Sequence, residues 1–384
     1  MAGFLTNVAQ TEPFGIVGAA TALRFDRDML KDFAGPVILF DHLRLRAAGF
    51  PPHPHAGLGI VTYLPEDSPG ALRDRDTASG ETRVEPGDLL WFRTGTGLIH
   101  EENPAAEGME VNQVQIWVPL AEKSQALPPA TSLLKAAAVP VAGDAGGNRV
   151  KVMLGEYGGA RSPLETTEPF ALLDLALSGR LPLEVPVGWE GIVYASAGEI
   201  AVELPGEGAV LGPGQVIGIR PGAALRLRGN GARALYMARP ILGRPLVVQG
   251  MYAMAGQADI DAAKRRFHAG EFGEIVPYPK IEHPERKYVP AGLEPDLAVT
   301  PVVLRQAEVR HYDQGWWKLR LQYVRYEYNN SETAHGYRFV WENPDGEEEP
   351  YQLGGYIPYM EYAAELLAIA GREGWGNIPY RDSF

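Results

Sequence analysis

Two histidines lie two residues apart in the stretch FPPHPHAGLGIVTY, residues Phe50–Tyr63. The whole chain has only eight histidines, and the segment that follows this pair has the alternation and β-branched residues of a strand. A strand directs residues i and i+2 to the same face, so His53 and His55 are expected to project together. Two imidazoles on one surface suit a metal ion, provided that further ligands come from elsewhere in the chain.

A second cluster of metal-ligating types occurs in GLIHEENP, residues 97–104. His100 and Glu102 share one face of the predicted strand, whereas Glu101 points the other way. Together with the first pair this gives three imidazoles and one carboxylate, a donor set that suits Fe(II), Mn(II), Ni(II), Cu(II) or Zn(II). The alternative is that these are surface or capping histidines. Two pairs at strand spacing, each beside a tight turn, favour the metal site.

The composition narrows the chemistry further. The 384 residues include no cysteine, which removes disulfides, thiolate nucleophiles and thiol redox switches, so a transition metal must use His, Asp or Glu. A net charge of −13 argues against a general surface for nucleic acid or anionic membranes. There is no apolar run of membrane-spanning length and no secretory signal at the start, so a cytoplasmic protein is expected.

Short strands must position these side chains. The chain has 45 Gly and 32 Pro, and β-branched or aromatic runs alternate with turn-forming clusters. Such runs are GIVTYL, GDLLWFRTG, VNQVQIWVPL, EGIVYASAGEIAVEL and GQVIGIRPG. This density predicts an all-β sandwich or barrel. Helix signals are sparse and are confined to Asp259–Gly270 and the segment PYMEYAAELLAIAGREG.

A weak internal repeat indicates two related barrels. The segments RVEPGDLLWFRTGTG and GAVLGPGQVIGIRPGA share a Pro-Gly turn, an acidic or amide residue, a strand and a second glycine-bearing turn. The stretch Ala121–Ser132 is interpreted as a connector between the two. His42, with core-like neighbours, is expected to pack or hydrogen-bond rather than ligate. Trp91 and Phe92 are expected in the core and at the rim rather than as a cofactor clamp. Arg73–Asp76 is interpreted as a solvated hairpin tip with paired charges.

The order of these motifs resembles the pirin family, a branch of the cupin superfamily. The segments GPVILFDHLRLRAAGFPPHPHAGLGIVTYL, GETRVEPGDLLWFRTGTGLIHEENP, GRPLVVQGMYAM and DIDAAKRRFHAGEFGEI carry the resemblance, which covers about residues 1–275. It implies a bicupin: two tandem β-barrels with one mononuclear metal, usually iron, in the N-terminal barrel. The implied ligands are His53, His55, His100 and Glu102, and we expect one divalent ion, Fe(II) above the alternatives Mn, Ni, Cu and Zn.

The predicted domains are a metal-binding cupin over 1–125, a metal-free cupin over 133–278 and an extra α+β domain over 285–384. The second barrel has no histidine between Glu101 and Phe267, so it cannot rebuild a three-imidazole site. Pirins usually have a basic residue, an aromatic and an acid after the second histidine, where this chain has Ala56, Leu58 and Gly59. We therefore expect a smaller, less charged cavity rim and an altered substrate.

The last hundred residues match nothing in the resemblance. WWKLRLQYVRYEY and HGYRFVWENPDGEEEPYQL alternate like antiparallel strands with PDG as a turn, and the C-terminal helix is expected to cover one face. Six aromatic side chains are expected to form the sheet core or a subunit contact, with stacking on a planar or sugar ligand as the alternative. These are Trp316, Trp317, Tyr323, Tyr337, Phe339 and Trp341.

The resemblance implies a metal-dependent dioxygenase of the quercetin 2,3-dioxygenase type, acting on a flavonol or another planar enol with O2. Glu102 is the expected catalytic residue, taking the substrate's hydroxyl proton as a general base. The alternative is a non-catalytic iron-binding regulator that docks on a protein partner, with the C-terminal domain serving that contact or self-association. A third hypothesis, isomerisation or hydrolysis, predicts turnover with Zn(II) and without O2.

Overall fold

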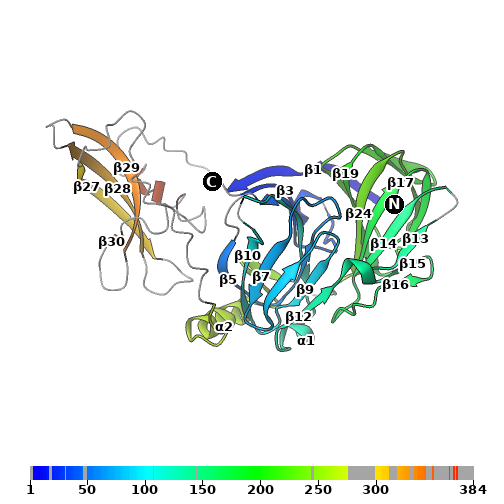
Figure 1. Cartoon of the computed structure of the whole chain (residues 1–384), viewed down its shortest axis with the longest axis horizontal. Helices are drawn as coiled ribbons and strands as arrows, with labels where there is room; N and C mark the ends of the chain where they lie inside the picture. Colours follow the sequence, from blue (N-terminus) through cyan, green and yellow to red (C-terminus); the bar gives the residue numbers. More distant parts are fainter. Residues whose placement is uncertain are drawn as a thin grey trace. The chain divides into compact units, whose positions relative to one another are not determined.

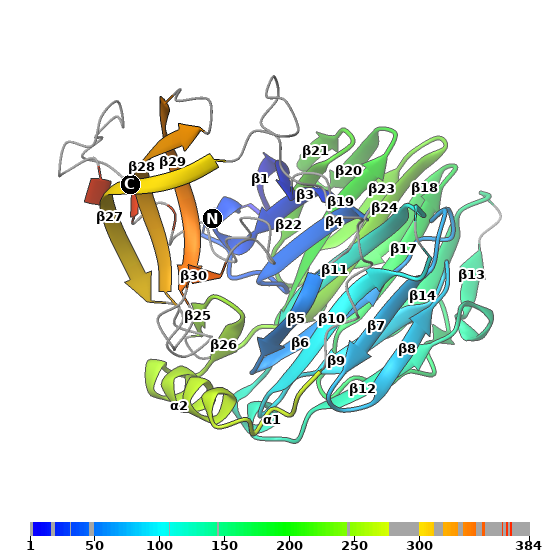
Figure 2. The ribbon, with the colours of Figure 1, turned by 60° about the vertical axis from the view of Figure 1, so that its left-hand side comes forward.

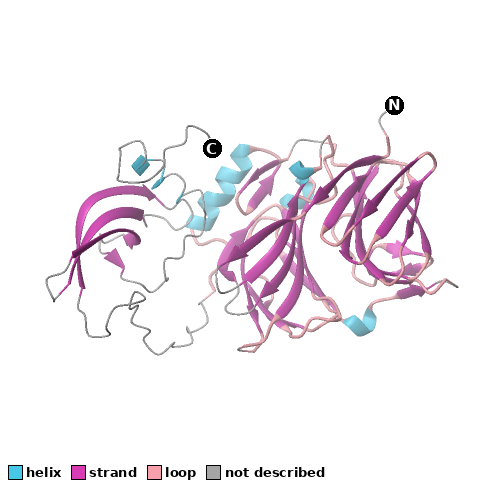
Figure 3. Cartoon of the chain, turned by 90° about the horizontal axis from the view of Figure 1, so that it is seen from above, coloured by secondary structure: helices cyan, strands magenta, loops and turns pink. Residues whose placement is uncertain are grey.

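The computed structural model divides the chain into two compact units, Met1–Pro277 and Tyr278–Phe384. The residues that it describes are 3–275 without 17–19, 31, 46–49, 107, 144–145 and 244–245, then 299–310, 318–328, 333–342, 348–349, 363, 366, 367, 369 and 370. Strands dominate both units, as Figures 1 and 3 show. The all-β prediction is confirmed.

The first barrel is built from a seven-stranded and a four-stranded sheet. The large sheet has the order β12-β9-β6-β11-β4-β3-β2, and the small sheet has the order β5-β10-β7-β8. Bounds in the large sheet are β2 (Glu12–Ile16), β3 (Ala20–Asp26), β4 (Leu39–Leu45), β6 (Leu58–Tyr63), β9 (Leu89–Arg93), β11 (Val111–Pro119) and β12 (Ala130–Leu134). Bounds in the small sheet are β5 (Phe50–His55), β7 (Leu72–Asp76), β8 (Gly80–Val84) and β10 (Leu98–Pro104).

The second barrel repeats this plan strand for strand. Its sheets have the orders β1-β22-β19-β24-β17-β14-β13 and β18-β23-β20-β21. The large sheet contains β1 (Leu5–Gln10), β13 (Val141–Gly143), β14 (Arg149–Leu154), β17 (Ala171–Leu177), β19 (Trp189–Ala197), β22 (Gln215–Ile219) and β24 (Ala232–Pro240). The small sheet contains β18 (Arg180–Glu184), β20 (Ile200–Leu204), β21 (Glu207–Leu211) and β23 (Ala224–Arg228).

Short elements connect the barrels and follow them. The hairpin β15 (Glu156–Tyr157) with β16 (Ala160–Arg161) lies in the second barrel, and β25 (Val247–Gln249) pairs with β26 (Tyr252–Met254) after it. Helices are α1 (Glu122–Gln125) and α2 (Gln257–His268), with 3₁₀ turns at Arg27–Met29 and Ala136–Ala138. Helix α2 begins two residues before the predicted Asp259. No helix in the described part of the chain is long and apolar enough to cross a membrane.

Each barrel takes an edge strand from outside its own stretch of sequence. The N-terminal strand β1 pairs with β22 of the second barrel, and β12 pairs with β9 of the first. The last three residues of the predicted connector, 130–132, therefore belong to strand β12. The segment after the second barrel returns to the first, because Tyr252 bridges to Ala56 and Ala253 lies in the first barrel's core. Figure 2 shows β26 beside the first barrel.

Three large apolar clusters hold this unit together, with a smaller one that packs Ile260 and Ala263 of α2 with Tyr252. One fills each barrel, and the third lies between the two large sheets, where Phe40 and Tyr194 approach with ring centroids 4.6 Å apart. His42 also joins the two barrels, since its Nδ1 lies 3.0 Å from the Tyr194 hydroxyl and its Nε2 lies 2.9 Å from Asn112 Oδ1. The prediction that His42 hydrogen-bonds near the first barrel is confirmed. So are the core positions of Trp91 and Phe92.

The internal repeat corresponds to one hairpin in each barrel, β8–β9 and β21–β22. In the first, Asp88 Oδ2 accepts the backbone N–H of Glu85 at 3.0 Å. In the second, Gln215 Oε1 accepts the backbone N–H of Gly212 at 2.7 Å. The acidic or amide residue of the repeat thus closes the same turn twice, which explains why either chemical type is accepted there.

The second unit is a four-stranded antiparallel sheet of order β27-β28-β29-β30. Its strands are β27 (Val299–Arg310), β28 (Lys318–Tyr328), β29 (Thr333–Glu342) and β30 (Glu348–Glu349). Leu366 and Ala370 are helical and pack with Leu319, Leu321 and Trp341, so the described helical residues lie against the sheet. The core prediction is confirmed for Trp341, with Tyr323 and Phe339 partly buried against it. Trp316, Trp317 and the PDG turn lie outside the described residues.

Candidate metal centre

The small sheet of the first barrel brings the two histidine pairs together. Strands β5 and β10 are antiparallel neighbours, with His53 directly opposite His100 and His55 opposite Leu98. Strand β10 pairs on its other side with β7, where Asp74 lies opposite Glu102. Because alternate side chains of a strand share a face, this register places both pairs on the same side of the sheet.

The three imidazoles converge as predicted. His53, His55 and His100 each offer a nitrogen within 4.8 Å of the others, and their ring centroids are 4.4–5.1 Å apart. His55 and His100 have no exposed surface. Burial lowers the pKa of both below its ordinary value, and for His55 the two neighbouring histidines lower it further. A lowered pKa favours the neutral ring, which is the form that binds metals.

The outer nitrogens of the two buried rings are already engaged. His100 Nδ1 lies 3.1 Å from Asp74 Oδ2, and His55 Nδ1 lies 3.2 Å from the Met251 carbonyl oxygen. The Nε2 atoms of His55 and His100 are buried and have no hydrogen-bond partner among the described residues. Buried polar atoms are rarely left in this state. Two converging nitrogen lone pairs without donors fit a cation, so the residues present suit a metal ion.

Glu102 is buried beside His100 and is held by three donors. Its Oε1 accepts from Thr62 Oγ1 and Gln113 Nε2, both at 2.9 Å, and its Oε2 accepts from Gln115 Nε2 at 2.6 Å. Burial raises the pKa of Glu102 above its ordinary value. Among the described residues it groups with Asp74 and His100, whereas the three histidines form a group of their own. The two groups share His100.

Asp74 corrects the interpretation of Arg73–Asp76 as a solvated tip. Strand β7 buries alternate residues, so Asp74 and Asp76 have almost no exposure, while Arg75 pairs with Glu101. The charges of the RDRD run suggested that all four side chains lie in solvent. Its period-2 alternation, however, was the signal of a strand with an acidic inner face.

Sequence reasoning also missed three residues that contact the site, Met251, Gln113 and Gln115. Met251 contacts His55, and the two glutamines contact Glu102, across chain separations that a local sequence pattern does not reveal.

Apolar rings enclose the histidines. The rings of Phe92 and His100 are 5.1 Å apart, as are those of Trp117 and His55. The three positions that depart from the pirin pattern are buried as well: Ala56 and Leu58 have no exposed surface, and Gly59 lies under Trp91, whose ring occupies the space of a Cβ.

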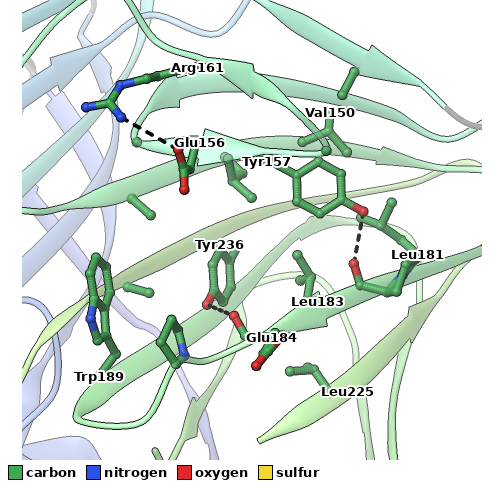
Figure 4. A pocket seen from close by; sticks show the side chains of 18 of the residues that line it. Val150, Glu156, Tyr157, Arg161, Leu181, Leu183, Glu184, Trp189, Leu225 and Tyr236 are labelled. Atoms are coloured by element: carbon green, nitrogen blue, oxygen red, sulfur yellow. Dashed lines mark hydrogen bonds and ion pairs between the residues drawn. The ribbon is translucent and has the colours of Figure 1, made fainter. Parts of the chain in front are cut away.

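A large cavity, of about 1580 Å³, lies in the second barrel rather than at the histidines. Figure 4 shows Tyr157, Trp189 and Tyr236 around it, with the ion pair of Arg161 and Glu156 on one side. The hydroxyls of Tyr157 and Tyr236 donate to backbone carbonyls at 2.9 and 3.3 Å. The lining contains no histidine, so this cavity offers no counterpart of the metal centre.

Two tandem barrels with a histidine cluster in the first define a bicupin. The pirin family model matches residues 11–118. Pirin-like protein 2 of Arabidopsis thaliana is 30% identical over 257 residues, covering 63% of this chain and 77% of that protein. Human pirin is 32% identical over 189 residues, covering 48% of this chain and 63% of that protein. The chain belongs to the pirin family.

A solved structure agrees with this assignment. Quercetin 2,3-dioxygenase from Acinetobacter baumannii superposes with a TM-score of 0.62 and 25% sequence identity. The match covers 70% of this chain and 98% of that one. The share of this chain that is left over corresponds in size to the second unit.

Proposed function

We propose that the protein is a metal-dependent dioxygenase that opens a flavonol or another planar enol with O2. The observation that carries the proposal is the convergence of three imidazoles, two of them with buried, partnerless Nε2 atoms. The similarity to a quercetin 2,3-dioxygenase over nearly the whole of that enzyme supports the substrate class.

The residues proposed to hold the ion are His53, His55, His100 and Glu102. Fe(II) is the proposed metal, and Mn, Ni, Cu and Zn suit the same nitrogen and oxygen donors. When bound, such an ion supplies open coordination positions and a redox-active or Lewis-acidic centre for the reaction with O2.

Glu102 is the proposed catalytic base, taking the substrate's hydroxyl proton. The three side-chain donors fix the orientation of its carboxylate. Oε1 accepts two of these hydrogen bonds and Oε2 accepts one, so Oε2 has the freer lone pair. The raised pKa of Glu102 suits a group that must accept a proton.

The apolar rings around the centre complete the proposal. Phe92 and Trp117 lie against the two buried imidazoles and exclude water from that side. A low-dielectric wall strengthens the interactions of Glu102 and also protects reactive species from side reactions. A planar aromatic substrate suits such a wall, because its rings gain apolar contact.

Oxygen uptake separates this proposal from a purely regulatory protein. Protein loaded anaerobically with iron is mixed with a flavonol and then with air, and O2 consumption is recorded beside the loss of flavonol absorbance. The proposal expects stoichiometric loss of both, abolished in Glu102→Gln if that variant retains its metal. Iron-loaded protein that consumes no O2 with any planar enol favours the regulator, and turnover with Zn(II) without O2 favours isomerisation or hydrolysis.

A further inference from the structure

The carboxylate of Asp74 lies behind His100, on the Nδ1 side of the ring. Its Oδ2 is 3.1 Å from His100 Nδ1, and neither side chain is exposed. The position is set by strand pairing, since β7 runs beside β10 and places Asp74 opposite Glu102. Asp74 therefore contacts the ring at Nδ1 and leaves Nε2 without a hydrogen-bond partner among the described residues.

We propose that Asp74 is a positioning residue of the metal centre, which fixes the tautomer of His100 and supplies the second negative charge that a divalent ion requires there. The inference rests on the proposed metal site and adds a residue outside the ligand set.

The tautomer follows from the hydrogen bond. A neutral imidazole has one N–H, and a carboxylate accepts it at Nδ1, which leaves Nε2 as a lone pair. That Nε2 is buried without a partner among the described residues. His55 is oriented in the same way by the Met251 carbonyl, which has no net charge. The two rings thus share an orientation but differ in the charge behind them.

The charge argument concerns the whole buried cluster. Three neutral imidazoles leave a divalent ion with two uncompensated positive charges, which is costly in a site without solvent. Once an ion is bound, Glu102 can offset one of them, and Asp74, in the same ligand-capable group, can offset the other. Glu101 is also buried on β10, but it is already paired with Arg75 and contributes no net charge.

Two variants separate the roles of tautomer and charge. Asp74→Asn keeps an acceptor for the Nδ1–H and removes the charge, whereas Asp74→Leu removes both at similar volume. Affinity for Zn(II) and Co(II) is measured by competition with a chromogenic chelator, and the Co(II) visible spectrum reports the ligand geometry. We expect Asp74→Asn to weaken binding by about 10–100-fold with a nearly unchanged spectrum, and Asp74→Leu to weaken it more and to alter the spectrum.

Glu101→Gln is the matched control, because it removes a buried carboxylate from the neighbouring strand without touching an imidazole. We expect it to leave the metal affinity unchanged. Unchanged affinity in both Asp74 variants overturns the role of Asp74 and leaves the metal site standing, whereas a wild-type chain that binds neither ion overturns both.

A measurement on the wild-type protein removes any dependence on the folding of the variants. In nitrogen-15 spectra of labelled histidine, recorded without metal, His100 is expected to be protonated at Nδ1 only. Protonation at Nε2 instead overturns the proposal.

Discussion

The two barrels share one framework and differ in what lines it. In the first, β5 and β10 carry His53, His55, His100 and Glu102. In the second, the strands at the same places in the sheet order are β18 and β23, and their buried residues are Leu181, Leu183, Leu225 and Leu227. Alternation thus fixes which side chains enter a barrel, while their chemical type decides between a site and a core.

The buried polar side chains of the first barrel also require hydrogen-bond partners, which the leucines at the same places in the second barrel do not. Glu102 has three donors and His100 has a carboxylate. The leucines need only packing, and all four belong to one apolar cluster. A buried site is therefore a property of two layers of residues, and the framework alone does not create it.

The largest expected effect is the loss of the metal when a ligand is removed. His53→Ala or His100→Ala should abolish stoichiometric metal retention, because only two imidazoles and one carboxylate would remain to hold the ion. Elemental analysis of protein purified without added metal measures this. His42→Gln is the matched control, since His42 bridges the barrels, and it should retain the ion. Unchanged metal content in both ligand variants would defeat the assignment.

The next largest effect is expected when a carboxylate is placed in the apolar interior of the second barrel. Leu227→Glu should lower the free energy of unfolding by about 3–5 kcal/mol at neutral pH, because the carboxylate is buried without donors. Its folded pKa should lie above its unfolded pKa, so the loss should shrink as the pH falls through the folded pKa. Chemical denaturation at several pH values measures it. Leu227→Gln, which does not titrate, should show a pH-independent loss.

A smaller effect concerns the contact between the barrels. Burial lowers the pKa of His42 below 6.5, so the unfolded chain binds the proton more readily than the folded one. The stability that neutral His42 supports should be present above pH 6.5 and be lost as the pH falls below it, at about 1.4 kcal/mol for each unit by which the pKa is lowered. Denaturation of wild type and His42→Gln checks this. Parallel pH profiles would contradict it.

The smallest effect should follow deletion of the C-terminal region after about Pro290. Because the site residues and their partners all lie in the first unit, the truncated protein should keep its metal content and its fold. Elemental analysis and circular dichroism of the two proteins measure this. Loss of the ion from the shortened chain would refute the proposed domain partition.

Many of the strands and their inward faces were determined by patterns among residues close together in the sequence. Alternation and turn residues identified the strands β6, β9, β11 and β22, and the long run EGIVYASAGEIAVEL gave β19 and β20, separated at Gly198 with its φ of +68°. The spacing of the histidine pairs predicted which rings share a face. These features are local, since a strand's two faces are set by its own dihedral angles.

Only the tertiary structure decided which strands meet. Strand β1 pairs within the second barrel and β12 within the first, so both depend on pairings between distant segments. The same holds for the contact of Asp74 with His100 and for that of the Met251 carbonyl with His55, which spans 196 residues. Such contacts follow from register and closure of the sheets, which the whole core selects together. The sequence therefore determined the candidate metal-ligating side chains, and the fold determined what holds them in place.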